Sequence, residues 1–112
     1  MSVSVKDMMA GLRILIVDDE KAVRTALVRL LGTREEWVVV GEAADGAEAI
    51  GKAKELKPDV VIMDVTLPEL NGLAATPEIK KAIPSTEILN SRSMNPLRLS
   101  ARLEMREPAV TY

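Results

Sequence analysis

Two short apolar runs in this chain each end in carboxylates. Residues 14–17 (ILIV) lead directly into Asp18 and Asp19, and residues 60–63 (VVIM) lead directly into Asp64. A continuous apolar run that ends at polar or turn residues is typical of a strand buried on both faces, as in a parallel sheet. The pattern therefore predicts two buried parallel strands, each followed by acid.

The segments around these two strands alternate between helical and extended patterns. Apolar positions recur at helical spacing in two segments, and a β-branched run begins at Trp37. The pattern predicts strands at Arg13–Val17, Trp37–Gly41 and Asp59–Met63 and from Glu87 onward, with helices at Lys21–Leu31, Ala47–Leu56 and between Gly72 and Ile83. This alternating order implies right-handed crossovers and an α/β fold with a doubly wound parallel sheet.

Two prolines affect the helices predicted in the C-terminal half. Pro77 interrupts the third helical segment, and a shortened helix fits there with Thr76 as N-cap and Pro77 at the first helical position. After Asn95 and Pro96, apolar residues alternate with polar ones, which favours a strand, but the residue types are helix formers. We expect a helix from Pro96 to Glu107 whose apolar residues are divided between two faces.

The composition excludes several kinds of site. The 112 residues suffice for one domain and include no Cys and no His. Disulfides, thiol catalysis, zinc sites and Ser-His pairs are thereby excluded. The net charge of −2 gives no basic field for nucleic acid, and no apolar stretch reaches the roughly 18 residues of a membrane span. We expect a cytoplasmic protein that contacts neither nucleic acid nor membrane directly.

The three carboxylates that follow the strands are predicted to share one site. Parallel strands end at the same edge of a sheet, and ligands of open α/β sheets bind outside that edge. Asp18, Asp19 and Asp64 would gather there, and three anions require a cation. Oxygen ligands suit Mg²⁺, so the sequence predicts a magnesium site. The structural alternatives are that Asp18 caps the following helix and that Asp64 only ends a strand.

Three motifs carry a resemblance to a known family. They are ILIVDDE at residues 14–20, VVVGEAADGAEAI at residues 38–50, and DVVIMDVTLPELNGL at residues 59–73 with the spacing D-x-x-L-P-x-x-x-G. In combination they are highly specific. Residues 11–89 resemble the receiver domain of two-component response regulators, in particular the group with a C-terminal helix-turn-helix domain. The resemblance implies a flavodoxin-like receiver fold with strand order 2-1-3-4-5.

The resemblance also implies roles for the acidic residues. Carried over by position, Asp64 would be the phospho-acceptor, and Asp18 and Asp19 would bind Mg²⁺ together with Asp64. The backbone carbonyl of Thr66 would be a further metal ligand. The phosphodonor would be a histidine kinase, and the domain would be a signalling switch and not an enzyme. A carboxylate can attack phosphorus as a covalent nucleophile, while Mg²⁺ offsets the negative charge of the reacting oxygens.

The chain departs from the family pattern toward its C-terminus. We interpret residues 1–10 as a leader, residues 11–89 as the receiver-like domain and residues 90–112 as an atypical tail. The family has Ser or Thr at the end of strand four and a Lys at the end of strand five. The tail contains no Lys, and only Ser91 and Ser93 lie near the expected hydroxyl. The fold is therefore predicted to be incomplete after the fourth strand.

One hypothesis for the tail concerns its reading frame. When the codons are read two nucleotides downstream, residues 90–95 can spell FSVHE and residues 104–112 can spell DAGASGYV. These strings resemble the end of strand four and the segment before strand five of receivers. A frameshift near Asn90 would then have replaced the C-terminal third and impaired the switch. Chance similarity is the alternative, and the nucleotide sequence of the gene decides between them.

Two alternative functions remain open. A degenerate receiver-like binding module would keep the fold but fail to switch, because the family Lys and the strand-four hydroxyl are missing. An Asp-dependent phosphohydrolase would use Asp64 as nucleophile, but such enzymes need a second Asp where this chain has Thr66. An uncovered fourth strand would also promote self-association, unless the tail lies along that strand or over the apolar stripe of residues 21–31.

Overall fold

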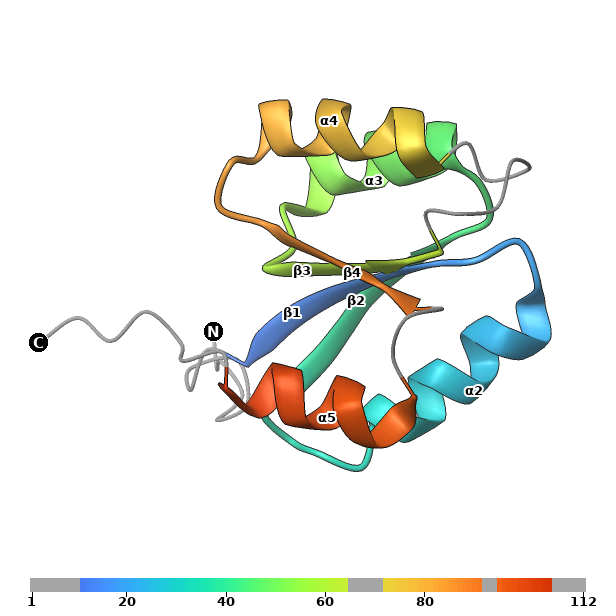
Figure 1. The fold of residues 1–112 in the computed structure, drawn as a ribbon, viewed down its shortest axis with the longest axis vertical. Coiled ribbons are helices and arrows are strands. Elements are labelled where there is room, and N and C mark those ends of the chain that lie inside the picture. Colours follow the sequence, from blue (N-terminus) through green and yellow to red (C-terminus); the bar gives the residue numbers. More distant parts are fainter. Residues whose placement is uncertain (1–10, 65–71, 92–94, 106–112) are drawn as a thin grey trace, which may run out of the picture.

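The computed structural model describes residues 11–64, 72–91 and 95–105. These residues form one parallel sheet with strand order β2-β1-β3-β4 (Figure 1). The strands are β1 (Leu12–Val17), β2 (Trp37–Ala43), β3 (Val60–Met63) and β4 (Glu87–Asn90). The helices are α2 (Lys21–Leu31), α3 (Gly46–Leu56), α4 (Gly72–Ala82) and α5 (Pro96–Met105). None of these helices is both long and apolar enough to cross a bilayer.

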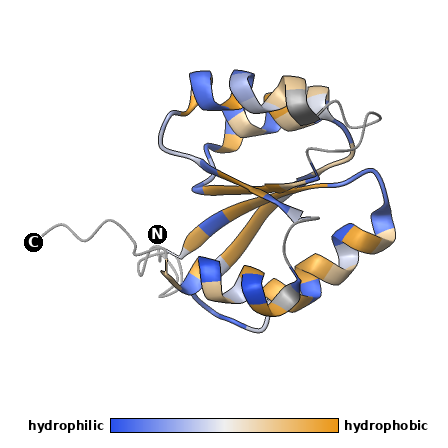
Figure 2. Ribbon diagram, viewed as in Figure 1, coloured by the Kyte–Doolittle hydropathy of each residue, from blue (hydrophilic) through white to orange (hydrophobic). Residues whose placement is uncertain are grey.

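Helices cover both faces of the sheet, with α3 and α4 on one face and α2 and α5 on the other (Figure 1). Successive strand side chains point to opposite faces, so the two central strands supply two apolar cores, and the strands appear mostly in hydrophobic colours in Figure 2. Leu15, Val17, Val61 and Met63 pack under α3 and α4, and Ile14, Ile16, Val60 and Ile62 pack under α2 and α5. Burial on both faces explains why these strands are continuous apolar runs.

The predicted fold class is confirmed. The sheet is parallel and doubly wound, and its order matches the first four positions of the predicted flavodoxin-like order. The first three strands and the first two helices lie within two residues of their predicted bounds, and β4 begins at Glu87 as predicted. The described sheet ends at this fourth strand, which agrees with the expectation of an incomplete receiver fold.

The helix that contains Pro77 differs from the prediction. Helix α4 spans Gly72–Ala82, which confirms the predicted helix between Gly72 and Ile83. It runs through Pro77, so the prediction that this helix is shortened to start at Pro77 is wrong. Pro77 is the sixth residue of α4, and its missing N–H removes one hydrogen bond near the start of the helix. Ala75 and Ile79 are both buried against the sheet, and their packing keeps the turns on either side of Pro77 in one helix.

The tail forms α5 and covers the sheet face beside α2. Asn95 caps this helix, since its Oδ1 accepts the backbone N–H three residues further on at 2.8 Å. Leu99 and Leu103 are 3% and 2% exposed, whereas Leu97 and Met105 are 82% and 76% exposed. The predicted helix and the division of its apolar residues between two faces are confirmed within the described residues.

Two ion pairs join α5 to the rest of the chain. Arg34 pairs with Glu104, and Arg102 Nη2 lies 2.6 Å from Glu87 Oε2 at the start of β4. All four side chains remain partly exposed, and pairs of this kind contribute up to about 1 kcal/mol each. The packing of Leu103 and its neighbours against the sheet is therefore the larger source of stability for α5.

We expect Leu103→Ala to lower the free energy of unfolding by about 2–5 kcal/mol, because it leaves a cavity between α5 and the sheet. Met105→Ala is the matched control on the same helix, and its effect should stay within about 0.5 kcal/mol, since Met105 faces solvent. Urea denaturation followed by circular dichroism measures both changes. Equal, small effects of the two substitutions would show that α5 does not pack on the sheet.

Candidate functional site

The register of the sheet brings two acidic residues to one edge. Val17 of β1 and Met63 of β3 are paired residues of neighbouring parallel strands. Asp18 and Asp64 each follow directly, so both lie at the carboxyl edge of the sheet. Asp64 is fully buried and Asp18 is almost fully buried. Two of the three predicted carboxylates thus come from adjacent strands and are enclosed by protein.

Asp18 is held by backbone contacts on both sides. Its N–H donates to the carbonyl of Ala43 at the end of β2, at 3.0 Å. Its Oδ1 accepts the N–H of Glu20 at 2.8 Å. Side chains of Asp commonly make this turn with the residue two positions on. Since Glu20 is the N-cap of α2 and has no side-chain cap bond, Asp18 shapes the loop before the helix and does not cap the helix itself.

The surroundings of Asp18 disfavour its charged form. Burial raises the pKa of this carboxyl above the ordinary 3.8, and the nearby acids Asp19 and Glu20 raise it further, against the opposing hydrogen bond from the Glu20 N–H. The negative charge of a buried carboxylate beside two further acids is energetically unfavourable. A bound cation would offset this charge, so the donor set fits a hard divalent ion such as Mg²⁺.

The structure describes one of the two remaining predicted ligands, Asp19, which is close enough to Asp18 to raise its pKa. Asp19 is exposed, and Thr66 lies outside the described residues. The described part of the chain contains no group of three or more acidic side chains arranged to hold a metal ion. Mg²⁺ keeps several waters and is usually bound through one or two carboxylates, a requirement that Asp18 and Asp64 can meet. The full predicted ligand set of Asp18, Asp19, Asp64 and Thr66 stays a prediction.

Arg24 of α2 is a residue of this site that the sequence reasoning missed. Its Nη1 donates to the backbone carbonyl of Asp18 at 2.6 Å, and its Nε donates to Glu42 Oε1 at 3.2 Å. The side chain is largely buried, at 16% exposed. Arg24 therefore joins the acidic loop to α2 and β2. The signal in the sequence was a pair of cations, Lys21 and Arg24, in the first turn of the helix that follows three consecutive acids.

The same edge carries a hydroxyl residue. Met63 pairs with Asn90 across β3 and β4, so Ser91, like Asp64, is the first residue beyond a paired position. Ser91 follows directly after the last residue of β4. Ser93 lies outside the described residues. Within the described residues, Ser91 is therefore a candidate hydroxyl at the acidic edge.

Comparison with known proteins agrees with this arrangement. The response regulator receiver domain family matches residues 14–96. The chain is 46% identical over 84 residues to the chemotaxis protein CheY of Thermotoga maritima, covering 75% of this chain and 69% of that protein. It is 44% identical over 79 residues to the response regulator protein VraR of Staphylococcus epidermidis, covering 70% of this chain. The chain spans 38% of the length of that VraR protein.

Solved structures with the same fold include two informative neighbours. A LuxR-family two-component response regulator from Aurantimonas sp. SI85-9A1 has a TM-score of 0.70 and 30% identity, over 86% of this chain and 87% of that chain. The CheX–CheY–BeF3–Mg complex from Borrelia burgdorferi has a TM-score of 0.65 and 27% identity, over 73% of this chain and 62% of that chain.

We expect Asp18→Asn to stabilise the chain at neutral pH. The pKa of Asp18 in the folded state lies above the ordinary value of 3.8. Ionisation of Asp18 therefore lowers the free energy of unfolding as the pH rises above 3.8, and this loss persists at all higher pH values. Asn keeps an oxygen that accepts the Glu20 N–H but carries no charge. The gain should be present at about pH 7 and absent at about pH 3.5, where the wild-type carboxyl is protonated in both states.

Thermal denaturation without Mg²⁺ at the two pH values measures this difference. Glu55→Gln, an exposed carboxylate of α3, is the control for the loss of one negative charge. A gain of the same size at both pH values would mean that the charge of Asp18 is not the cause.

Proposed function

The chain belongs to the response regulator receiver domain family, and on that premise we propose that it accepts a phosphoryl group on Asp64. The observation that carries the proposal is the position of Asp64. It is fully buried at the carboxyl end of β3, beside Asp18 on β1. Its position within the matched family motif and its enclosure at the ligand-binding edge both support this role.

The proposed chemistry is a transfer from phosphohistidine to aspartate. A carboxylate oxygen of Asp64 forms a bond to phosphorus while the bond between phosphorus and the imidazole nitrogen of the donor breaks. The imidazole leaves with the electron pair of that bond and takes up a proton. The donor would be a histidine kinase, in the cytoplasm. Since receiver domains are signalling modules, the aspartyl-phosphate is a signal and not a step in metabolism.

Mg²⁺ is the proposed cofactor. Asp18, Asp19 and Asp64 would hold it together with the backbone carbonyl of Thr66, and the bound ion would supply positive charge to the phosphoryl oxygens. The surroundings of Asp18 support this assignment, because burial and then the neighbouring acids raise the pKa of its carboxyl, and a bound cation would offset that cost of its negative charge. The name of the solved CheX–CheY–BeF3–Mg complex places Mg²⁺ with a related receiver. Arg24 would keep the acidic loop in place through the carbonyl of Asp18.

A degenerate receiver-like binding module is the second candidate function. It is favoured by the tail, which contains no Lys to contact the phosphoryl group. In this case the fold and its docking surfaces would persist without a phosphorylation-dependent switch. An Asp-nucleophile phosphohydrolase is the third candidate, and the occurrence of Thr66 where such enzymes need Asp disfavours it.

Labelling with acetyl phosphate separates the three functions. We expect the wild-type chain to gain one phosphoryl group in the presence of Mg²⁺ and none in the presence of EDTA, as measured by intact-protein mass spectrometry. Asp64→Asn should abolish labelling, because the amide is a poor nucleophile, whereas Glu55→Gln should leave it unchanged. No labelling of a folded wild-type chain supports the binding module, and continuous release of phosphate supports the hydrolase.

The missing Lys leads to a further expectation about the switch. The phosphoryl group would lack one charge-assisted contact, worth roughly 1.5–3 kcal/mol, so phosphorylation should be weakly coupled to conformation. Hydrogen exchange with and without beryllofluoride and Mg²⁺ measures this coupling. We expect added protection close to Asp18 and Asp64 only. Protection that extends to α4 and β4 would contradict weak coupling.

A further inference from the structure

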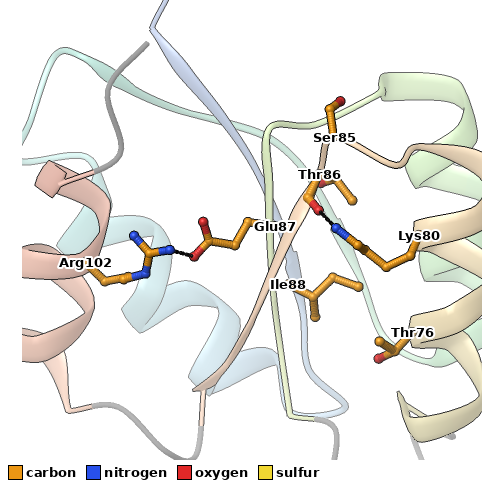
Figure 3. A pocket seen from close by; sticks show the side chains of 7 residues that line it. All are labelled: Thr76, Lys80, Ser85, Thr86, Glu87, Ile88 and Arg102. Carbon is orange, nitrogen blue, oxygen red and sulfur yellow. Dashed lines mark hydrogen bonds and ion pairs between the residues drawn. The ribbon is translucent and has the colours of Figure 1, made fainter. Parts of the chain in front are cut away.

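The outer edge of β4 forms an open groove between two helices. No other described strand pairs with this edge, and α4 and α5 flank it on the two sides of the sheet (Figure 1). The groove has a volume of about 600 Å³. Its lining comes from α4, from β4 with the two residues before it, and from α5: Thr76, Lys80, Ser85, Thr86, Glu87, Ile88 and Arg102 (Figure 3).

Backbone groups of β4 point into this groove. The N–H of Glu87 donates to the carbonyl of Asp59, on the side of β3, at 2.9 Å. Successive residues of a strand direct their backbone groups to opposite sides, so the N–H and the carbonyl of Ile88 face outward. The carbonyl of Thr86, also outward, accepts a hydrogen bond from Lys80 Nζ at 2.5 Å. Lys80 thus covers the beginning of the edge, and no described strand pairs with this edge at Ile88.

The rims of the groove are basic. Lys80 lies on the α4 side of the groove, and its Nζ donates to the carbonyls of Thr86 and Pro84. Among the described residues it forms no ion pair. Arg102 stands on the α5 side and pairs with Glu87 at 2.6 Å. Arg98 lies one helical turn before Arg102 on the same side of α5. The described rims therefore carry more cationic than acidic side chains, in a chain whose net charge is −2.

The handedness of the fold disfavours a strand from this chain in the groove. The connection from β3 to β4 passes through α4 on the face that α3 also covers, and α5 lies on the opposite face. A parallel strand placed outside β4 after α5 would need a left-handed crossover. Such connections are right-handed in about 98% of cases.

A second copy of the chain is disfavoured by charge. Antiparallel pairing of two β4 edges about a two-fold axis brings Lys80 toward Lys80 and Arg102 toward Arg102 of the other copy. Parallel pairing brings Lys80 toward Arg102. Like charges placed opposite each other across strands destabilise pairing. Both arrangements therefore add repulsion at the rims.

We propose that the outer edge of β4 binds an extended, acidic segment of a partner protein as a fifth strand. Strand addition at an exposed edge supplies affinity through main-chain hydrogen bonds and specificity through side-chain contacts. Here the main-chain contacts would be those of Ile88, and acidic side chains of the segment would face Lys80 on one rim and Arg98 and Arg102 on the other. This site is at the opposite end of β4 from the acidic edge and does not depend on phosphorylation of Asp64.

A synthetic peptide with alternating Val and Glu, capped at both ends, tests the proposal on the full 112-residue chain. We expect the Ile88 amide to shift in NMR spectra and to exchange more slowly when the peptide is added. Lys80→Glu should weaken binding by about tenfold, the effect of losing one good charge contact. Lys81→Glu, an exposed residue in the last turn of the same helix, should change binding less than twofold, roughly the scatter of a surface charge.

Two further probes make the result specific. Ile88→Pro removes the outward N–H but keeps the hydrogen bonds between β4 and β3. Edge strands tolerate proline at such a position. We expect this substitution to abolish peptide binding. If this variant does not fold, the comparison of Lys80→Glu with Lys81→Glu decides the question alone. A peptide with Lys in place of Glu should bind at least about tenfold more weakly.

Several outcomes would overturn the proposal. Equal binding of the Glu and Lys peptides, or unchanged binding by Lys80→Glu, would exclude an acidic partner. Slow exchange of the Ile88 amide without peptide would show that the edge is already filled. If that protection increased with protein concentration, the occupant would be a second copy, and if it did not, the occupant would be a segment of the same chain.

Discussion

The register of the parallel sheet is the constraint on which the rest of the structure depends. Val17 pairs with Met63, and Met63 pairs with Asn90. This pairing fixes where each strand ends, so that Asp18, Asp64 and Ser91 reach one edge although they are far apart in the sequence. A shift of one residue in β3 would send its side chains to the opposite faces and displace Asp64 from Asp18. The two apolar cores therefore hold the site in place.

The tail contributes to this constraint although its sequence departs from the family pattern. Leu99 and Leu103 of α5 are buried against the same sheet face as Ile14, Ile16 and Leu31. Burial of two Leu side chains is worth roughly 3–6 kcal/mol at about 1.5–3 each. Typical domains have a total stability of about 5–15 kcal/mol. A helix on this face thus supplies a large share of the stability of a typical domain, whereas β4 can remain an edge strand because Lys80 covers part of it.

Most of the fold could be predicted from the sequence because the local signals are strong. The apolar runs before Asp18 and Asp64 and the amphipathic stripe of α2 each favour one structure only. The segment of α4 was predicted, but the shortening at Pro77 was wrong, because the burial of Ala75 and Ile79 outweighs the local signal of Pro77. The sequence of α5 does not indicate which of its faces packs against the sheet, because both faces carry apolar residues.

The candidate site was predicted in part. Asp18 and Asp64 follow apolar strands, and that pattern is visible in the sequence. The contacts of Arg24 depend on how α2 turns back over β2, and no local pattern specifies that approach. The groove beside β4 likewise arises from the face on which α5 docks. Sequence patterns thus identify strand ends, and tertiary packing determines which long side chains reach them.

A crystal structure of the 112-residue chain grown with Mg²⁺ and beryllofluoride would show directly whether Asp64 is the phospho-acceptor. We expect beryllofluoride on a carboxylate oxygen of Asp64 and one Mg²⁺ ion that contacts both Asp64 and the acidic pair Asp18–Asp19. Beryllofluoride bound elsewhere, or a Mg²⁺ ion that does not contact Asp18 or Asp64, would contradict the assignment of this edge as the phospho-acceptor site.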